Sequence, residues 1–308
     1  MKSVRLLRRV PAYALTAALA GCASFAPHGG VPSAMPPSGA ARGAASQNLL
    51  YLSDVKSNTV AIHGYPKGGL VGKLTGLGKP RSECAGAAGN VWIADVEALQ
   101  IDEYKPGRTK PAISLSTQGT PSGCSVSPVD GNIAIAGGPN GIVLSIFHRS
   151  VRKHWRDAKV FTDKTMVTGY FCGYDGQGNL FVDGVSSDGS FVLAELPRGG
   201  KALVDIAVSQ TIKVPGQVQW DGTNVAIGDA GVVPSVVYQF SISGSTAKKA
   251  GTTTLSGSKS VRQFWIDGNT IVGPDYGADV GVWAYPAGGF PMKKFSVAGY
   301  GATLSAAQ

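Results

Sequence analysis

Residues 173–184 read GYDGQGNLFVDG, in which a Gly-Asn pair separates two short apolar runs and the second run ends in an acid. The same frame returns around Asn90, Asn132, Asn179, Asn224 and Asn269. Asn48 fits it without the Gly, and the six asparagines are 42, 42, 47, 45 and 45 residues apart. A repeat of about 40 to 45 residues containing four short strands is typical of a propeller.

A second turn marker follows five of the six asparagines and divides the repeat further. Pro-Gly turns lie at 64–69, 103–107, 196–200 and 284–289, and 241–245 is a looser copy. Each unit therefore predicts a strand, a Gly-Asn turn, a strand, a loop, a strand, a Pro-Gly turn and a final strand. Gly and Asn accept the positive φ of tight hairpin turns, so we assign the pair to the hairpin between the first two strands.

The chain ends predict how the ring closes. The unit at Asn48 lacks a first strand, and one unassigned apolar segment remains at residues 299–305. A strand from each end of the chain would then complete one sheet and remove the exposed sheet edge. The sequence predicts an all-β fold, a six-bladed β-propeller over residues 48–308.

The repeat also resembles a known family. PSGCSVSPVDGNIAIAG (121–137) and PGQVQWDGTNVAIGD (215–229) match a Pro-x-Gly, strand, Gly-Asn, strand, Asp plan most closely. Over residues 48–305 the chain is similar to NHL-repeat and streptogramin-lyase-like propellers. The resemblance implies the fold, but such propellers host many activities.

The first 47 residues predict export and a tether. Residues 1–21 combine a basic start with an apolar run too short to span a membrane, as in an export signal. The run ends in LAGC (19–22), which resembles a bacterial lipobox and implies cleavage before Cys22 and a lipid on it. The alternative is an ordinary export signal with a chance cysteine. Residues 22–47 are rich in Pro, Gly, Ala and Ser, a composition that predicts a disordered tether.

The export signal and the net charge of the chain limit the partners that we expect. No Asp follows Cys22 directly, which resembles the pattern of lipoproteins sent to the outer membrane, on a side that the sequence leaves open. The net charge is +9, and without the four basic residues of the signal it is about +5. This mild bias does not indicate nucleic-acid binding. We expect a monomer that binds an envelope protein or a small molecule.

Acids recur where the loops between strands 2 and 3 begin, on the usual binding face of a propeller. They are Asp54, Asp95, Asp183, Asp229 and Asp275. Such a ring of carboxylates predicts a site for a divalent cation such as Ca²⁺, or else acids that cap loops through backbone N–H groups. Related lactonase-type propellers hold a metal through a Glu, and the resemblance implies Glu83, placed just before its first strand, as the candidate.

The resemblance leaves a second function open. Streptogramin lyases use a His near a metal, but we expect no His in a loop of this face. We therefore favour a binding or protein-interaction module over an enzyme. The alternative is a metal-dependent lyase or lactonase that acts on a small molecule.

Two further features have alternative interpretations. A basic hairpin contains Arg149, Arg152, Lys153, Trp155 and Arg156, which indicates a patch for an anionic ligand or a solvated hairpin whose Trp lies on the sheet. Strand alternation places Cys84 and Cys124 on facing surfaces of adjacent blades, so they either form a disulfide or stay buried thiols.

Overall fold

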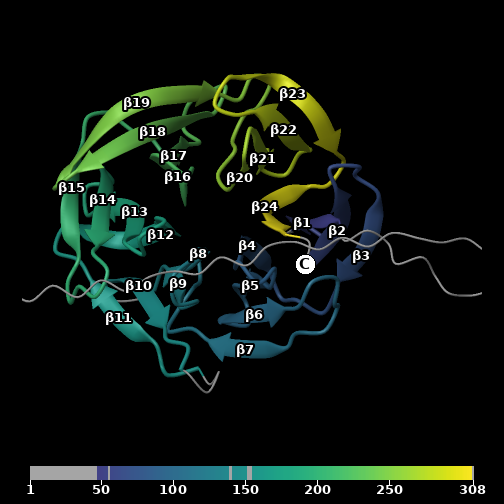
Figure 1. Ribbon diagram of the computed structural model, residues 1–308, viewed down its shortest axis with the longest axis horizontal. Helices are drawn as coiled ribbons and strands as arrows, with labels where there is room; N and C mark the ends of the chain where they lie inside the picture. The colour runs from purple at the N-terminus through teal and green to yellow at the C-terminus, as the bar shows by residue number, and fades with distance from the viewer. Residues whose placement is uncertain (1–46, 55, 139–140, 151–154, 307–308) are drawn as a thin grey trace, which may run out of the picture. The chain divides into compact units, whose positions relative to one another are not determined.

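A computed structural model describes residues 47–54, 56–138, 141–150 and 155–306. These residues form strands β1 to β24 and no α-helix, so none of them belongs to a helix that could cross a membrane. The strands lie in sheets around a common centre, with β4, β8, β12, β16, β20 and β24 innermost (Figure 1).

Each sheet runs outward from the centre, and we name the sheets by letter. Sheet A orders β24 (Gly299–Ser305), β1 (Asn48–Asp54), β2 (Thr59–Tyr65) and β3 (Leu70–Leu74). Sheet B contains β4 (Pro80–Ala85), β5 (Val91–Asp95), β6 (Gln100–Tyr104) and β7 (Ile113–Ser116). Sheet C contains β8 (Gly123–Val126), β9 (Ile133–Ala136), β10 (Ile142–Phe147) and β11 (Lys159–Thr162).

The other strands form an eight-stranded sheet with two halves, D and E, and a last sheet, F. Half D contains β12 (Met166–Tyr174), β13 (Leu180–Ser186), β14 (Phe191–Leu196) and β15 (Val204–Val208). Half E contains β16 (Pro215–Trp220), β17 (Val225–Asp229), β18 (Val236–Ser243) and β19 (Thr246–Thr254). Sheet F contains β20 (Trp265–Asp267), β21 (Thr270–Pro274), β22 (Val280–Ala284) and β23 (Gly288–Phe295).

Sheet A contains strands from both ends of the chain. β1 pairs with β2 on one side and with β24 on the other, with Leu50 opposite Leu304. The innermost strand of sheet A therefore comes from residues 299–305, the segment that the sequence analysis assigned to it. This pairing completes the ring within the described residues.

Halves D and E are joined at their outer strands, which the repeat did not predict. β15 pairs with β14 only as far as Ile206 opposite Leu193. It then leaves β14 and runs parallel to β19, where Ala207 lies opposite Thr246. The outer part of half D is therefore opened between β14 and β15.

The apolar core is divided into layers, each shared by two neighbouring sheets. Tyr51 of β1 and Ile93 of β5 are fully buried between sheets A and B. Leu193 of β14 and Phe240 of β18 are buried in the same way between halves D and E. Burial contributes roughly 1.5 to 3 kcal/mol for each large apolar side chain, so adjacent sheets stabilise one another.

The Gly-Asn pairs form the turns between the first two strands, but only the Gly takes positive φ. Gly178 has φ 89°, a conformation that Gly adopts without a steric penalty. The side-chain oxygen of Asn179 instead accepts the backbone N–H of Arg198 in the outer turn, at 3.0 Å. Asn132 accepts the N–H of Arg149 in the same way, at 2.9 Å. The asparagine thus joins two turns at one end of its sheet.

Candidate functional site

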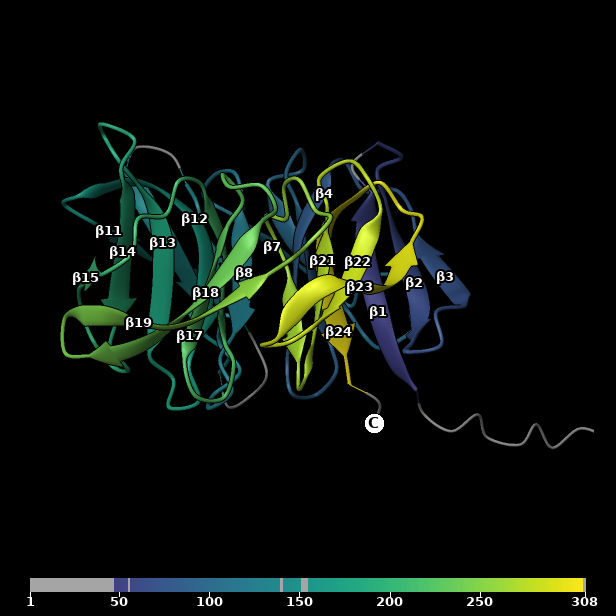
Figure 2. The ribbon, with the colours of Figure 1, turned by 90° about the horizontal axis from the view of Figure 1, so that it is seen from above.

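The ring has two ends, which we call the turn face and the loop face. The turn face holds the Gly-Asn turns and both ends of the described chain. The Ser305 hydroxyl donates to the carbonyl of Gly89 at 2.5 Å, and Asn48 pairs with Tyr65 at the outer turn of sheet A. The opposite end is the loop face, which holds the loops between strands 2 and 3 and the loops between successive sheets. Figure 2 shows the two ends above and below the strands.

Four of the recurring acids accept backbone N–H groups of the loop face. Asp229 accepts from Lys213, Val214 and Gly231 at 3.0, 3.1 and 2.9 Å. Asp95 accepts from Gly78, Lys79 and Ala98 at 2.7, 2.9 and 3.3 Å. Asp275 accepts from Lys259 and Ser260, and Asp54 from Lys56 and Ser57. Asp95, Asp229 and Asp275 therefore tie the loop that enters a sheet to the end of its second strand, and this favours the capping role.

Two of the predicted mouth residues lie inside strands and not at the strand ends predicted from the sequence. Asp183 lies inside β13, three residues before its end, and is fully buried. One of its oxygens accepts the N–H of Phe171 at 2.9 Å. Glu83 lies inside β4, not before it, and is 1% exposed. Each lies beside a bulge in the innermost strand of its sheet, since the register shifts between Pro80 and Glu83 in β4 and between Gly169 and Phe171, the partner of Asp183, in β12.

Glu83 is a buried carboxyl group without a hydrogen-bond partner on either oxygen. Burial raises its pKa from 4.5 to about 8, and Ser53 beside it lowers the pKa only in part. The reason is visible in the contacts of Ser53, whose hydroxyl donates to the carbonyl of Arg81 at 2.7 Å. That proton is therefore not available to Glu83, and the neutral acid is favoured.

No group of three or more His, Cys, Asp or Glu side chains is arranged to hold a metal ion among the described residues. The cation site at the mouth stays a prediction.

A different set of residues occupies the centre of the loop face. Where the recurring acids pair with the innermost strands, Asp54 lies opposite Gly299, Asp95 opposite Pro80, and Asp275 opposite Val261. The next residues along the chain are Tyr300, Arg81 and Arg262. They are not among the residues predicted from the sequence. Each of them directly follows the residue that pairs with a recurring acid, and this shared place is the signal that could have identified them.

These residues form a row with Tyr276, which we call the Tyr-Arg row. The rings of Tyr276 and Tyr300 meet edge to face with centroids 5.5 Å apart. The guanidinium of Arg81 lies 5.3 Å from the ring centroid of Tyr300, and that of Arg262 lies 5.4 Å from the centroid of Tyr276. Tyr276 is 53% exposed, and the Nε of Arg262 is buried without a hydrogen-bond partner.

The surroundings of the Tyr-Arg row are basic. Lys56 reaches the loop of Tyr276, where its ammonium group donates to the carbonyl of Gly277 at 3.3 Å. Lys259 is exposed nearby, while the oxygens of Asp275 are occupied by backbone N–H groups. Asp279 is an exposed carboxylate of the same loop. Neither arginine forms an ion pair among the described residues, so the row can meet carboxylate groups of a partner.

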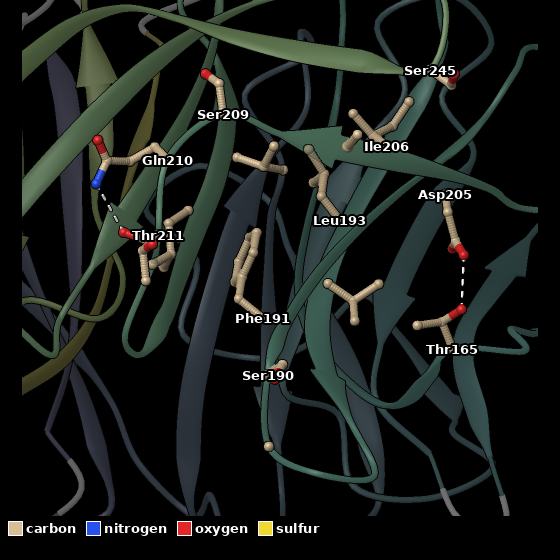
Figure 3. A pocket seen from close by; sticks show the side chains of 15 residues that line it. Thr165, Ser190, Phe191, Leu193, Asp205, Ile206, Ser209, Gln210, Thr211 and Ser245 are labelled. Atoms are coloured by element: carbon tan, nitrogen blue, oxygen red, sulfur yellow. Dashed lines mark hydrogen bonds between the residues drawn. The ribbon is translucent and has the colours of Figure 1, made fainter.

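A cavity of about 780 Å³ opens where β15 leaves β14 (Figure 3). Phe191, Leu193 and Ile206 line its apolar part. The only titratable side chain among the described residues that line it is Asp205, which accepts the hydroxyl of Thr165 at 2.8 Å. An apolar wall with few polar groups suits binding of a small molecule or a peptide.

The basic hairpin is described only in part, because Arg152 and Lys153 lie outside the described residues. Trp155 packs against the core between sheets B and C and meets Trp92 edge to face, with ring centroids 5.1 Å apart. The guanidinium of Arg149 lies 5.9 Å from the Trp155 ring, while Arg156 is exposed. These contacts favour the interpretation in which the Trp lies on the sheet.

Cys84 and Cys124 form a disulfide between β4 and β8, with Cα atoms 5.7 Å apart. Sheets B and C are thereby joined covalently at their innermost strands. Cys172 is a buried free thiol, and burial raises its pKa. Cys22, the predicted site of lipidation, lies outside the described residues.

No family model matches the sequence, and no curated protein matches it. Solved structures match the fold. A chain in the nidogen/laminin complex has a TM-score of 0.67 and 12% identity, and the match covers 85% of this chain and 99% of that one. A protein of unknown function from Bacteroides caccae has a TM-score of 0.63 and 12% identity, with 84% and 99% covered.

A third match is hydrazine synthase from Kuenenia stuttgartiensis, with a TM-score of 0.57, 12% identity, and 77% and 73% covered. At such identities the likeness establishes a β-propeller fold and no activity.

Proposed function

We propose that this chain is a six-bladed propeller of the NHL-like kind that serves as a protein-interaction module of the cell envelope. The two halves of the eight-stranded sheet count as two blades, because each repeats the four-strand order of sheets A, B, C and F. A lipid on Cys22 tethers the module to the outer membrane. The lipobox-like LAGC and the tether composition support this part of the proposal.

The Tyr-Arg row is the observation that carries the interaction role. Tyr and Arg are enriched among the residues that dominate binding energy at protein interfaces. Here they gather at the centre of one face, with an exposed ring between two unpaired guanidinium groups. The row lies at the end of the ring opposite Asn48, near which the described chain begins.

The nidogen/laminin structure is a complex of proteins, and the likeness of its chain supports a propeller that binds another protein.

The test is chemical crosslinking in the producing cells followed by identification of the captured protein. A double variant, Tyr276→Ala with Arg262→Gln, removes one ring and one guanidinium from the row. Loss of hot-spot residues weakens an interface by about 2 kcal/mol or more, so we expect capture to fall by roughly 30-fold.

Gln177→Ala, on the exposed turn face, is the matched control and should leave capture unchanged. Equal capture by the double variant and the parent chain would contradict the proposal.

A further inference from the structure

The outer strands of sheets A and F expose large apolar side chains. Phe290 and Met292 of β23 are 79% and 61% exposed. Leu70 and Val71 of β3 are also exposed. Four large apolar residues on two outer strands are more than the isolated cases expected on a surface.

Contacts at the end of β23 place the two strands side by side. The ammonium group of Lys293 donates to the carbonyls of Pro66 and Lys67, at 2.7 Å each, in the turn between β2 and β3. The ring of Phe295, at the end of β23, lies 5.1 Å from that of His63 in β2. The end of β23 and the turn before β3 are therefore neighbours on the rim, and we call β3, β23 and that turn the A/F rim. Phe290 lies toward the other end of β23, beside Gly257.

The A/F rim carries positive charge without acids. Lys67, Lys73 and Lys294 are exposed along it. The sequence holds no Asp or Glu between Asp54 and Glu83, and none after Asp279. The outer strands and turns of both sheets therefore combine exposed apolar groups with exposed ammonium groups. This is the chemistry that recognises an anionic lipid surface.

The start of the described chain lies beside the same rim. Asn48 pairs with Tyr65, the residue before Pro66, and a Cβ on Gly64 would meet the side chain of Gln47. The segment that leads to Cys22 therefore joins the ring next to Lys67.

We propose that the A/F rim docks on an anionic phospholipid surface, with Phe290 and Met292 entering the interface and the lysines meeting lipid phosphates. The site is distinct from the Tyr-Arg row, so one surface would face the membrane while the row stays accessible to a partner. The proposal deepens the proposed membrane tether, but it concerns the ring and not Cys22.

The test uses the chain from Ala23 onward without its lipid, because the ring closes within residues 47–306 and contains its own core. Binding is measured by sedimentation with vesicles of phosphatidylethanolamine and phosphatidylglycerol, and with vesicles of phosphatidylcholine alone. We expect binding to the anionic vesicles, lowered by salt. Lys67→Gln and Lys294→Gln should each weaken it roughly fivefold, and the pair Phe290→Ser with Met292→Ser by about tenfold or more.

Val233→Ser is the matched control, because Val233 is 76% exposed in the loop between β17 and β18 of half E and belongs to neither β3 nor β23. Equal binding of all variants, or equal binding to both kinds of vesicle, would overturn the proposal. So would a loss of self-association in the rim variants without a change in vesicle binding, since the rim would then join two copies. Because the chain carries no lipid, a failed Cys22 anchor cannot produce any of these results.

Discussion

The buried carboxyl of Glu83 predicts a stability that falls as the pH rises. Burial raises the pKa of Glu83 from 4.5 to about 8 in the folded chain. The folded state therefore holds a proton that the unfolded chain releases between these values. The stabilisation is fully present below pH 4.5 and is lost as the pH rises through about 8.

The size of the effect follows from the shift. Each pKa unit corresponds to about 1.4 kcal/mol, so at pH 8 ionisation of Glu83 lowers the free energy of unfolding by about 4 kcal/mol. Glu83→Gln keeps the shape of the side chain and removes the titration. We expect the variant to match the parent chain near pH 5 and to exceed it by up to about 4 kcal/mol near pH 8.

Guanidinium denaturation followed by tryptophan fluorescence measures this difference at each pH. Asp183, whose pKa burial also raises, is present in both chains, so comparison of the two isolates Glu83. A stability difference that is the same near pH 5 and near pH 8 would refute the assigned burial and protonation of Glu83.

Three further predictions concern stability. Asp229→Ala leaves three N–H groups without their acceptor and should cost about 3 kcal/mol or more by chemical denaturation, whereas Asp267→Ala, exposed on the turn face, should cost almost nothing. Cys84→Ser should lower the free energy of unfolding by up to about 4 kcal/mol, because the bond closes a loop with a sequence separation of 40. Gly301→Ala would press a Cβ against the carbonyl oxygen of Arg81 and should cost about 1 to 3 kcal/mol in thermal denaturation, while Gly69→Ala, with nothing within 4 Å, should be neutral. Equal effects in either matched pair, or a Cys84→Ser chain as stable as its parent, would contradict the contacts described.

The sequence predicted the hairpins and the strand order because turn residues act locally. The turn at Gly178 requires a positive φ, which Gly accepts whatever lies around it. The spacing of such turns along the sequence sets the length of the strands between them. The pairing of the segment 299–305 with β1 followed from counting strands, since a missing first strand has to come from the other end of the chain.

The position of Glu83 was missed because the bulge in β4 leaves no local signal. Asp183 was missed although it follows Asn179 by four residues, where Asp95 and Asp229 follow their asparagines by five. A bulge adds one residue to one strand and turns the following side chains to the other face. The register shifts in β4, β12, β16 and β24, each time near the residue that pairs with a recurring acid. The same shifts set the positions of Arg81 and Tyr300 at the mouth, and their only common signal is a place next to the residue that pairs with a recurring acid.

The joint between β15 and β19 was also beyond the sequence. The alternation of side chains in residues 204–208 is compatible with pairing to β14 or to β19. Nothing in these residues indicates that the strand leaves β14. The choice depends on packing across halves D and E, which is a long-range property.

We propose that the loop face recognises a partner through the Tyr-Arg row. The most direct measurement places a photo-crosslinking amino acid at Tyr276 in one chain and at Gln177, on the turn face, in another, and illuminates the producing cells. We expect a discrete protein adduct from position 276 and none from position 177. Adducts from position 177 alone, or the same adducts from both positions, would contradict the proposal.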